Sequence, residues 1–102
     1  MLPLITERRS EIAALCRRFG VRRLGVFGSA GRNGDFDPRR SDVDFIVAFE
    51  RTDGVSLGEF LALRDALSAT LGRPVDLVAE GSIRNPFIRA GIQRSVETIY
   101  GP

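Results

Sequence analysis

The chain has 102 residues and a formal net charge of +2, and 43% of its residues are hydrophobic, so we expect one globular domain over residues 1–102. It contains no His and no Trp, and all 15 basic residues are Arg. The missing His excludes Ser-His-Asp and Cys-His catalytic sets and His-containing zinc sites. The missing Lys excludes Schiff-base catalysis and the P-loop lysine. The remaining chemistry must use carboxylates, arginines, hydroxyls, backbone amides and metals bound by oxygen.

Charge and hydropathy also limit where the chain acts. The longest stretch without a charged residue, residues 24–31, has only eight residues, which is too short to span a bilayer. Charged residues at positions 7–9 interrupt the place where a signal peptide has its apolar core. The single Cys16 forms no internal disulfide, which suits a reducing compartment. We therefore expect a cytoplasmic location and no membrane contact.

The hydrophobic pattern predicts alternating helices and strands along the chain. A helix over residues 6–19, capped by Thr6 and ended by Gly20, is followed by a strand over 22–27. A buried strand over 43–49 and a helix over 56–71 come next. A third strand over 75–79 and a last helix over 86–95 complete the pattern. This order predicts an α/β domain with two layers.

Two aspartates stand at the start of the second predicted strand. Asp42 and Asp44 are separated by one residue, so their side chains point to the same face of the strand. Two like charges this close are costly to bury without a cation between them, and carboxylate oxygens favour Mg²⁺ or Mn²⁺. Asp76 lies in an otherwise apolar strand. If the third strand neighbours the second, Asp76 completes a set of three carboxylates able to hold two metal ions.

The turn after the first predicted strand has the residue types of a phosphate-binding site. Gly28 lets the backbone approach a ligand closely, and Ser29 adds a hydroxyl donor to the backbone amides. Metal-binding carboxylates that face such a turn are typical of phosphoryl or nucleotidyl transfer. Without His or Lys, Asp76 is the expected acceptor for the proton of an incoming hydroxyl group.

Each of these features also has a purely structural interpretation. The Gly-Ser pair alone fits an ordinary turn, and the Asp pair alone fits a solvated strand edge. Asp76 alone fits a residue that caps the turn after Pro74. Their combination, in this order and on successive elements, favours the catalytic interpretation.

The chain resembles the polymerase-beta-like nucleotidyltransferase superfamily in the segments GVFGSAGR, SDVDFIV and PVDLV. Its length is similar to that of the minimal nucleotidyltransferase (MNT) branch. The resemblance implies an α/β core with a mixed sheet and ATP as substrate. It also implies two Mg²⁺ ions, or Mn²⁺ in their place, bound by Asp42, Asp44 and Asp76. The nucleotide-binding residues that it implies are Gly28, Ser29 and Arg32.

The loop between the first two predicted strands departs from the family pattern. The loop segment 34–40 contains more residues than is usual in the family, and Asn33 stands where Gly is common. Arg39 and Arg40 in this loop have two interpretations. They either clamp the triphosphate through bidentate hydrogen bonds or are solvated loop charges that soften the cluster of acids.

The resemblance further implies a partner protein. Many MNT proteins are antitoxins paired with a HEPN-type ribonuclease toxin, and some members inactivate the toxin by transferring AMP to a tyrosine. The leading hypothesis is therefore AMP transfer from ATP to a hydroxyl group of such a toxin. The alternatives are a non-catalytic antitoxin that masks the toxin sterically, and a nucleotidyltransferase with a small-molecule or RNA acceptor. Direct nucleic-acid binding is not expected, because no aromatic array interleaves with the arginines.

The strand pattern also assigns the two faces of the sheet. Asp42 and Asp44 share their face with Ile46 and Ala48, so this face becomes apolar beyond the acids. The opposite face carries the apolar side chains that helices are expected to cover: Val43, Phe45, Val47 and Phe49. The apolar strip beyond the acids needs a cover, either a terminal segment of the same chain or another protein chain.

Overall fold

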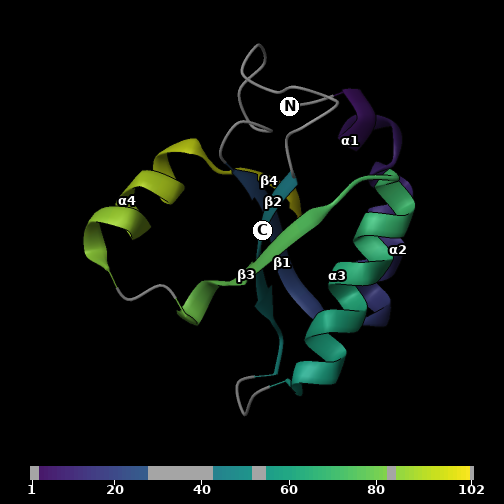
Figure 1. Ribbon diagram of the computed structural model, residues 1–102, viewed down its shortest axis with the longest axis horizontal. Coiled ribbons are helices and arrows are strands. Elements are labelled where there is room, and N and C mark those ends of the chain that lie inside the picture. The colour runs from purple at the N-terminus through teal and green to yellow at the C-terminus, as the bar shows by residue number, and fades with distance from the viewer. Residues whose placement is uncertain (1–2, 28–42, 52–54, 83–84, 102) are drawn as a thin grey trace.

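The architecture is a mixed four-stranded sheet with helices packed on it (Figure 1). The computed structural model describes residues 3–27, 43–51, 55–82 and 85–101. The strands are β1 (Val21–Phe27), β2 (Val43–Phe49), β3 (Val75–Ala79) and β4 (Glu97–Tyr100), in the order β3-β2-β1-β4. β1 pairs with β2 and with β4 in antiparallel fashion, whereas β2 and β3 run parallel. The predicted mixed α/β fold is therefore confirmed.

The helices are α1 (Pro3–Glu7), α2 (Arg9–Arg18), α3 (Leu57–Leu71) and α4 (Pro86–Ser95), with a 3₁₀ helix, η2 (Glu80–Ser82), after β3. The prediction of one helix over residues 6–19 is wrong, because this stretch contains the end of α1 and a separate helix, α2. Thr6 lies inside α1, and the residue before α2 is Arg8, whose side chain makes no capping hydrogen bond. None of the helices in the described residues has the length and apolar character that crossing a bilayer requires.

The ends of α3 follow the local signals of the sequence. The Ser56 hydroxyl accepts a hydrogen bond from the Glu59 amide at 3.1 Å, which satisfies one of the free donors at the start of the helix. Gly72 ends the helix with φ of 67°, a left-handed conformation that glycine adopts without a Cβ clash. These contacts fix where α3 stops and where β3 begins, and so they set the position of Asp76 in its strand.

One face of the sheet is covered by α2 and α3, which lie together on the same side of it in Figure 1. The predicted inward positions Val43, Phe45 and Val47 are buried there, and Phe49 is partly buried against the same core. The helices contribute their own buried side chains to this core: Ile12, Cys16, Leu63, Leu67 and Leu71. The residues of β2 that alternate with these positions, beginning with Asp44, therefore point to the other face.

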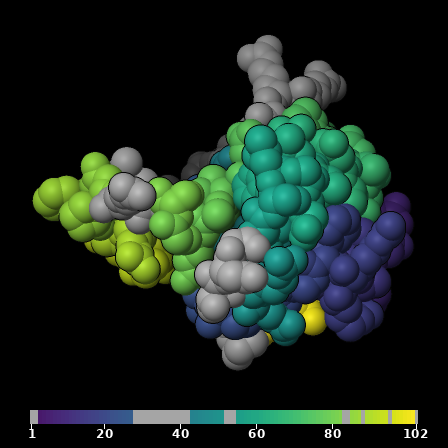
Figure 2. Space-filling view, turned by 90° about the horizontal axis from the view of Figure 1, so that it is seen from below, coloured from purple at the N-terminus to yellow at the C-terminus, as the bar shows by residue number. Residues whose placement is uncertain are grey.

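That other face is partly covered by the end of the chain. α4 lies on the opposite side of the sheet from α2 and α3 (Figure 1) and projects from the body of the molecule in Figure 2. After α4 the chain returns to the sheet as β4, a strand that the sequence analysis did not include. Val96 lies between the two elements and packs over Gly25 of β1. A terminal segment of the same chain thus provides part of the cover that the apolar strip needs.

We expect substitution of Gly25 by Ala to lower the free energy of unfolding by about 1–3 kcal/mol. A Cβ at this position would lie 2.5 Å from Val96 Cγ2 and 3.3 Å from the Glu97 carbonyl oxygen, so β4 would have to move. Urea denaturation measures the effect. Gly81→Ala is the matched control, because a Cβ there has no neighbour within 4 Å, and an equal loss in both variants would contradict this explanation.

Candidate active site

Two carboxylates lie side by side near the starts of neighbouring strands. The register of the parallel pair places Asp44 of β2 directly beside Asp76 of β3. Paired residues on adjacent strands share a face and are separated by about 5 Å between backbones. Asp44 is half-buried and Asp76 is exposed, so the pair is open to solvent on one side. The sequence predicts a joint site only if the third strand lies next to the second, and β3 does lie next to β2.

Phe27 completes a row of three residues across this end of the sheet. It is the last residue of β1, and its Cα is paired with that of Asp44 on the side away from Asp76. In the chain, Gly28 and Ser29 follow Phe27 directly. The predicted phosphate-binding turn is therefore connected to the same end of the sheet as the carboxylates.

Several predicted site residues lie outside the described residues. These residues belong to the segment 28–42 between β1 and β2, and they are Gly28, Ser29, Arg32, Arg39, Arg40 and Asp42. Asp42 is one residue before β2 begins at Val43. The described part of the chain contains no cluster of three or more His, Cys, Asp or Glu side chains that could hold a metal ion. Their roles therefore remain predictions.

The donor chemistry of the described pair fits a divalent metal ion. Asp44 and Asp76 supply only carboxylate oxygens, which are the ligands that Mg²⁺ prefers. Two like charges opposite each other on neighbouring strands repel, and a cation between them would remove that cost. Because one of the two side chains is exposed, water and phosphate oxygens also have access to such an ion.

The chain's only thiol is not part of this chemistry. Cys16 is buried in the core, and burial raises the pKa of its thiol from the usual 9.0 to about 11, although the Arg17 charge acts in the opposite direction. The thiol is therefore neutral at physiological pH. Because the folded state holds this proton more tightly than the unfolded state, the thiol's contribution to stability is lost as the pH rises from about 9 to about 11.

We expect Cys16 in the native chain to react with iodoacetamide at pH 8 about 100-fold more slowly than in the denatured chain. Burial blocks access, and the raised pKa leaves little thiolate for the reaction. Mass spectrometry of samples quenched at intervals measures the rate, with the chain in guanidinium chloride as the reference. Equal rates in the two states would show that the thiol is accessible in the folded protein.

The sequence analysis missed a pocket on the same face of the sheet as the carboxylates. The pocket lies between α4 and the sheet, has a volume of about 160 Å³ and includes Gly25 and Ile46 in its lining. An ion pair borders it, in which Arg23 Nη2 donates to both carboxylate oxygens of Glu80 at 2.5 and 2.6 Å. Arg23 and Glu80 are 57 positions apart in the sequence, so no local pattern reveals this pair or the pocket beside it.

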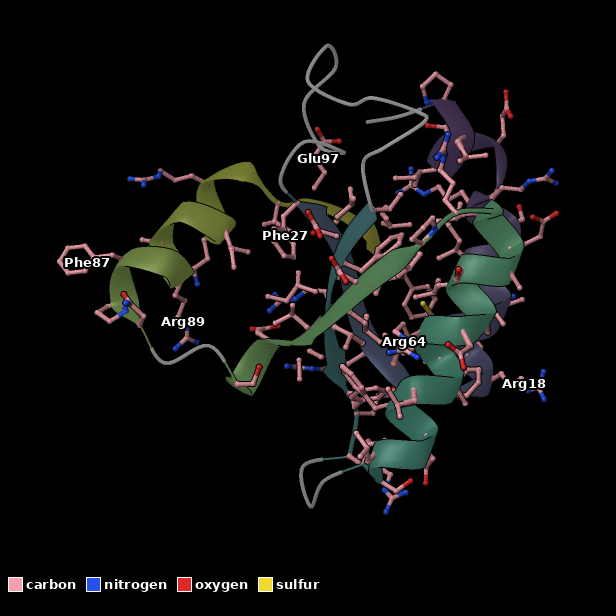
Figure 3. The ribbon with its side chains drawn as sticks, viewed as in Figure 1. Arg18, Phe27, Arg64, Phe87, Arg89 and Glu97 are labelled. Carbon is pink, nitrogen blue, oxygen red and sulfur yellow. The ribbon has the colours of Figure 1, made fainter. Side chains whose placement is uncertain are left out.

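The labelled side chains of Figure 3 show how α4 is oriented. Phe87 near its start points away from the molecule and is 86% exposed. Arg89 belongs to the pocket lining, together with Gln93 one turn later. Glu97, at the start of β4, is paired with Val26, next to Phe27, and brings a further carboxylate to this end of the sheet. The residues after Glu97, Thr-Ile-Tyr, are of types common in strands, and they are the signal in the sequence that could have revealed β4.

Comparisons with known proteins show which proteins the chain is similar to in sequence and in fold. The sequence model of the nucleotidyltransferase domain matches residues 10–99. The chain is 38% identical over 99 residues to the protein adenylyltransferase MntA of Thermococcus cleftensis, a match that covers 95% of this chain and 88% of that protein. A solved structure described as a minimal nucleotidyltransferase matches with a TM-score of 0.76 at 36% identity, covering 94% of this chain and 95% of that one.

A more distant match shows the same fold in a complex. It is a chain in the structure of the tri-AMPylated HEPN toxin of Shewanella oneidensis with an MNT antitoxin. The TM-score is 0.68 at 19% identity, and the match covers 95% of this chain and 72% of that chain. At this identity the likeness shows a shared fold.

Proposed function

The chain belongs to the nucleotidyltransferase domain family, and on that premise we propose that it transfers AMP from ATP to a hydroxyl group of a partner protein. Membership of the family was predicted from the sequence and is confirmed. The observation that carries the proposal is the pairing of Asp44 with Asp76 on neighbouring parallel strands. The relative from Thermococcus cleftensis, which shares 38% identity over nearly the whole chain, is named for this activity.

The carboxylates and the turn after β1 have separate roles in this proposal. Asp42, Asp44 and Asp76 hold two Mg²⁺ ions, and Gly28, Ser29 and Arg32 hold the triphosphate. The ions, when bound, neutralise negative charge that develops on the attacking and leaving oxygens. The chain's contribution is to fix the carboxylates on rigid strands, because the β2–β3 register sets the spacing of Asp44 and Asp76.

The proposed reaction exchanges one bond at the α-phosphorus for another. The hydroxyl oxygen of the partner attacks this phosphorus, the bond to the oxygen that bridges to the β-phosphorus breaks, and pyrophosphate leaves. The proton of the hydroxyl group passes to the carboxylate of Asp76, the more exposed member of the described pair. An acceptor brought by a separate protein can reach this side chain without any movement of the core.

The partner that we propose is a HEPN-type toxin, which the chain neutralises as an antitoxin. The support is the fold that this chain shares with a chain of the Shewanella oneidensis toxin–antitoxin complex. We further propose that residues 1–102 act as one domain, since the family model spans residues 10–99. Because ATP is the substrate, we place the reaction in the cytoplasm.

Transfer of labelled AMP tests this function. The purified chain is mixed with the HEPN-type protein from its own genome, with MgCl₂, and with ATP labelled on either the α- or the γ-phosphate. We expect the α-label, but not the γ-label, to become bound to the partner and the partner's ribonuclease activity to fall. Neutralisation without any bound label would instead identify an antitoxin that masks the toxin sterically, and transfer of the γ-label would identify a kinase.

A further inference from the structure

We propose that the pocket between α4 and the sheet, lined in part by Gly25, Ile46, Arg89, Gln93 and Thr98, binds the adenine base of the nucleotide. This inference rests on the proposed function, because it requires a nucleoside triphosphate at the carboxylates. It adds a determinant of base preference to the reaction. Four lines of evidence support it: the position of the pocket, its size, its side chains and the place that it leaves for the acceptor.

The position of the pocket follows from the β1–β2 register. Phe27 is paired with Asp44, and the next pair along that points to the same face is Gly25 with Ile46. The pocket floor is therefore two residues, or about 7 Å, from the Asp44 pair. The ribose of ATP spans a similar length between the α-phosphate and the base. A nucleotide with its α-phosphate at Asp44 can thus place its base over Gly25 and Ile46.

The size of the pocket fits a single ring system. Its volume of about 160 Å³ is close to that of a cavity of about 150 Å³ that binds benzene. An extended peptide advances about 3.3 Å per residue and needs a groove several residues long. A flat base is small enough to enter a space of this size, whereas the surface of a folded protein is not.

The side chains of α4 suit an adenine ring. Arg89 and Gln93 are four residues apart and therefore lie on one side of α4, and both line the pocket together with Val96, the residue that follows the helix. The carbonyl oxygen of the Gln93 side chain can accept from the amino group of adenine, and its NH₂ group can donate to a ring nitrogen. The guanidinium of Arg89 is planar and stacks on aromatic rings. Val96 and Ile46 supply apolar contacts to the faces of the ring.

The acceptor hydroxyl has a separate route. In the strand order β3-β2-β1-β4, Asp76 lies on one side of β2, whereas Gly25 and Thr98 lie on β1 and β4 on the other side. A nucleotide that extends over β1 leaves the β3 side open for the partner. Because the proton acceptor that we propose is Asp76, the hydroxyl group must approach from that side.

Calorimetric titration of the full chain with ATP, GTP and inorganic tripolyphosphate, each with MgCl₂, tests the inference. For Gln93→Ala we expect the Kd for ATP to rise about tenfold and the preference for ATP over GTP to disappear, with tripolyphosphate binding unchanged. Thr98→Phe, an exposed strand position at which an aromatic side chain would fill the pocket, is expected to bind ATP no more tightly than tripolyphosphate. Arg94→Ala, on the same helix but outside the pocket lining, is the matched control and should behave as the wild type.

The outcomes separate the pocket from the proposed function. Wild-type chain that binds neither ATP nor tripolyphosphate would refute the function itself. Equal affinity of the wild type for these two ligands would refute only the base pocket. Unchanged ATP binding by Gln93→Ala would also overturn the inference, and a raised KM for the partner in that variant would assign the pocket to the acceptor. Gln93 is exposed, so this variant tests the inference even if Thr98→Phe does not fold.

Discussion

Replacement of Asp44 by Asn is expected to reduce AMP transfer by on the order of 10³-fold or more, with the fold retained. Asp44 lies between Phe27 and Asp76 in the row across β1, β2 and β3, so its carboxylate is central to the proposed metal and nucleotide site. Asn keeps the size of the side chain and one oxygen acceptor but removes the charge. The initial rate of label transfer from ATP to the partner measures the effect, and far-UV circular dichroism checks the fold.

The matched control for this variant is Asp65→Asn. Asp65 is an exposed acid on α3 that pairs with the neighbouring Arg64 at 3.1 Å, on the layer of the molecule away from the carboxylate pair. The same change of charge there should leave the rate of AMP transfer within a factor of two. Asp44→Asn that keeps more than half of the wild-type activity would remove Asp44 from the metal site. Equal losses in both variants would show an effect of net charge instead.

The features of the fold that could be predicted are those with a local physical cause. Ser56 and Gly72 mark the two ends of α3. Ser56 begins the helix through a hydrogen bond to the next turn, and Gly72 ends it in a left-handed conformation, and each effect depends on a single residue type. Strands β1, β2 and β3 are short segments rich in apolar residues with one or two charged residues each, and the alternation within β2 assigns Asp44 to the face opposite the core. The parallel direction of β2 and β3 follows from the connection through α3, whereas the register that pairs Asp44 with Asp76 is seen only in the structure.

The features that could not be predicted depend on contacts between distant residues. The apolar stripe with Ile5 and Ile12 continues from α1 into α2, so periodicity alone does not reveal the break at Arg8. β4 has only four residues, too few for a clear pattern, and its stability depends on β1 and on the close packing of Val96 over Gly25. The base pocket that we propose exists only because α4 and β1 are brought together in this way.

Asp76→Asn is expected to move activity and stability in opposite directions. Without its proton acceptor, AMP transfer should fall by about 10²- to 10⁴-fold. In EDTA, the free energy of unfolding should rise by about 0.2–1 kcal/mol, because like charges on directly paired strand residues repel and this variant removes one of them. Replacement of a side chain that has a purely structural role would instead lower the free energy of unfolding. If Asp76 serves mainly to cap the turn after Pro74, the same substitution must lower stability.

Magnesium makes the contrast sharper. MgCl₂ should raise the Tm of the wild type, because an ion bound between Asp44 and Asp76 both relieves their repulsion and favours the folded state. Asp76→Asn should lose most of this rise, whereas Asp65→Asn should keep it, and excess EDTA should reverse it in every case. Differential scanning fluorimetry with and without MgCl₂ measures all three chains. If Asp76→Asn is less stable than the wild type in EDTA and its Tm still rises fully with MgCl₂, Asp76 has a structural role only. Loss of a metal ligand that faces a like charge should give the opposite of both results.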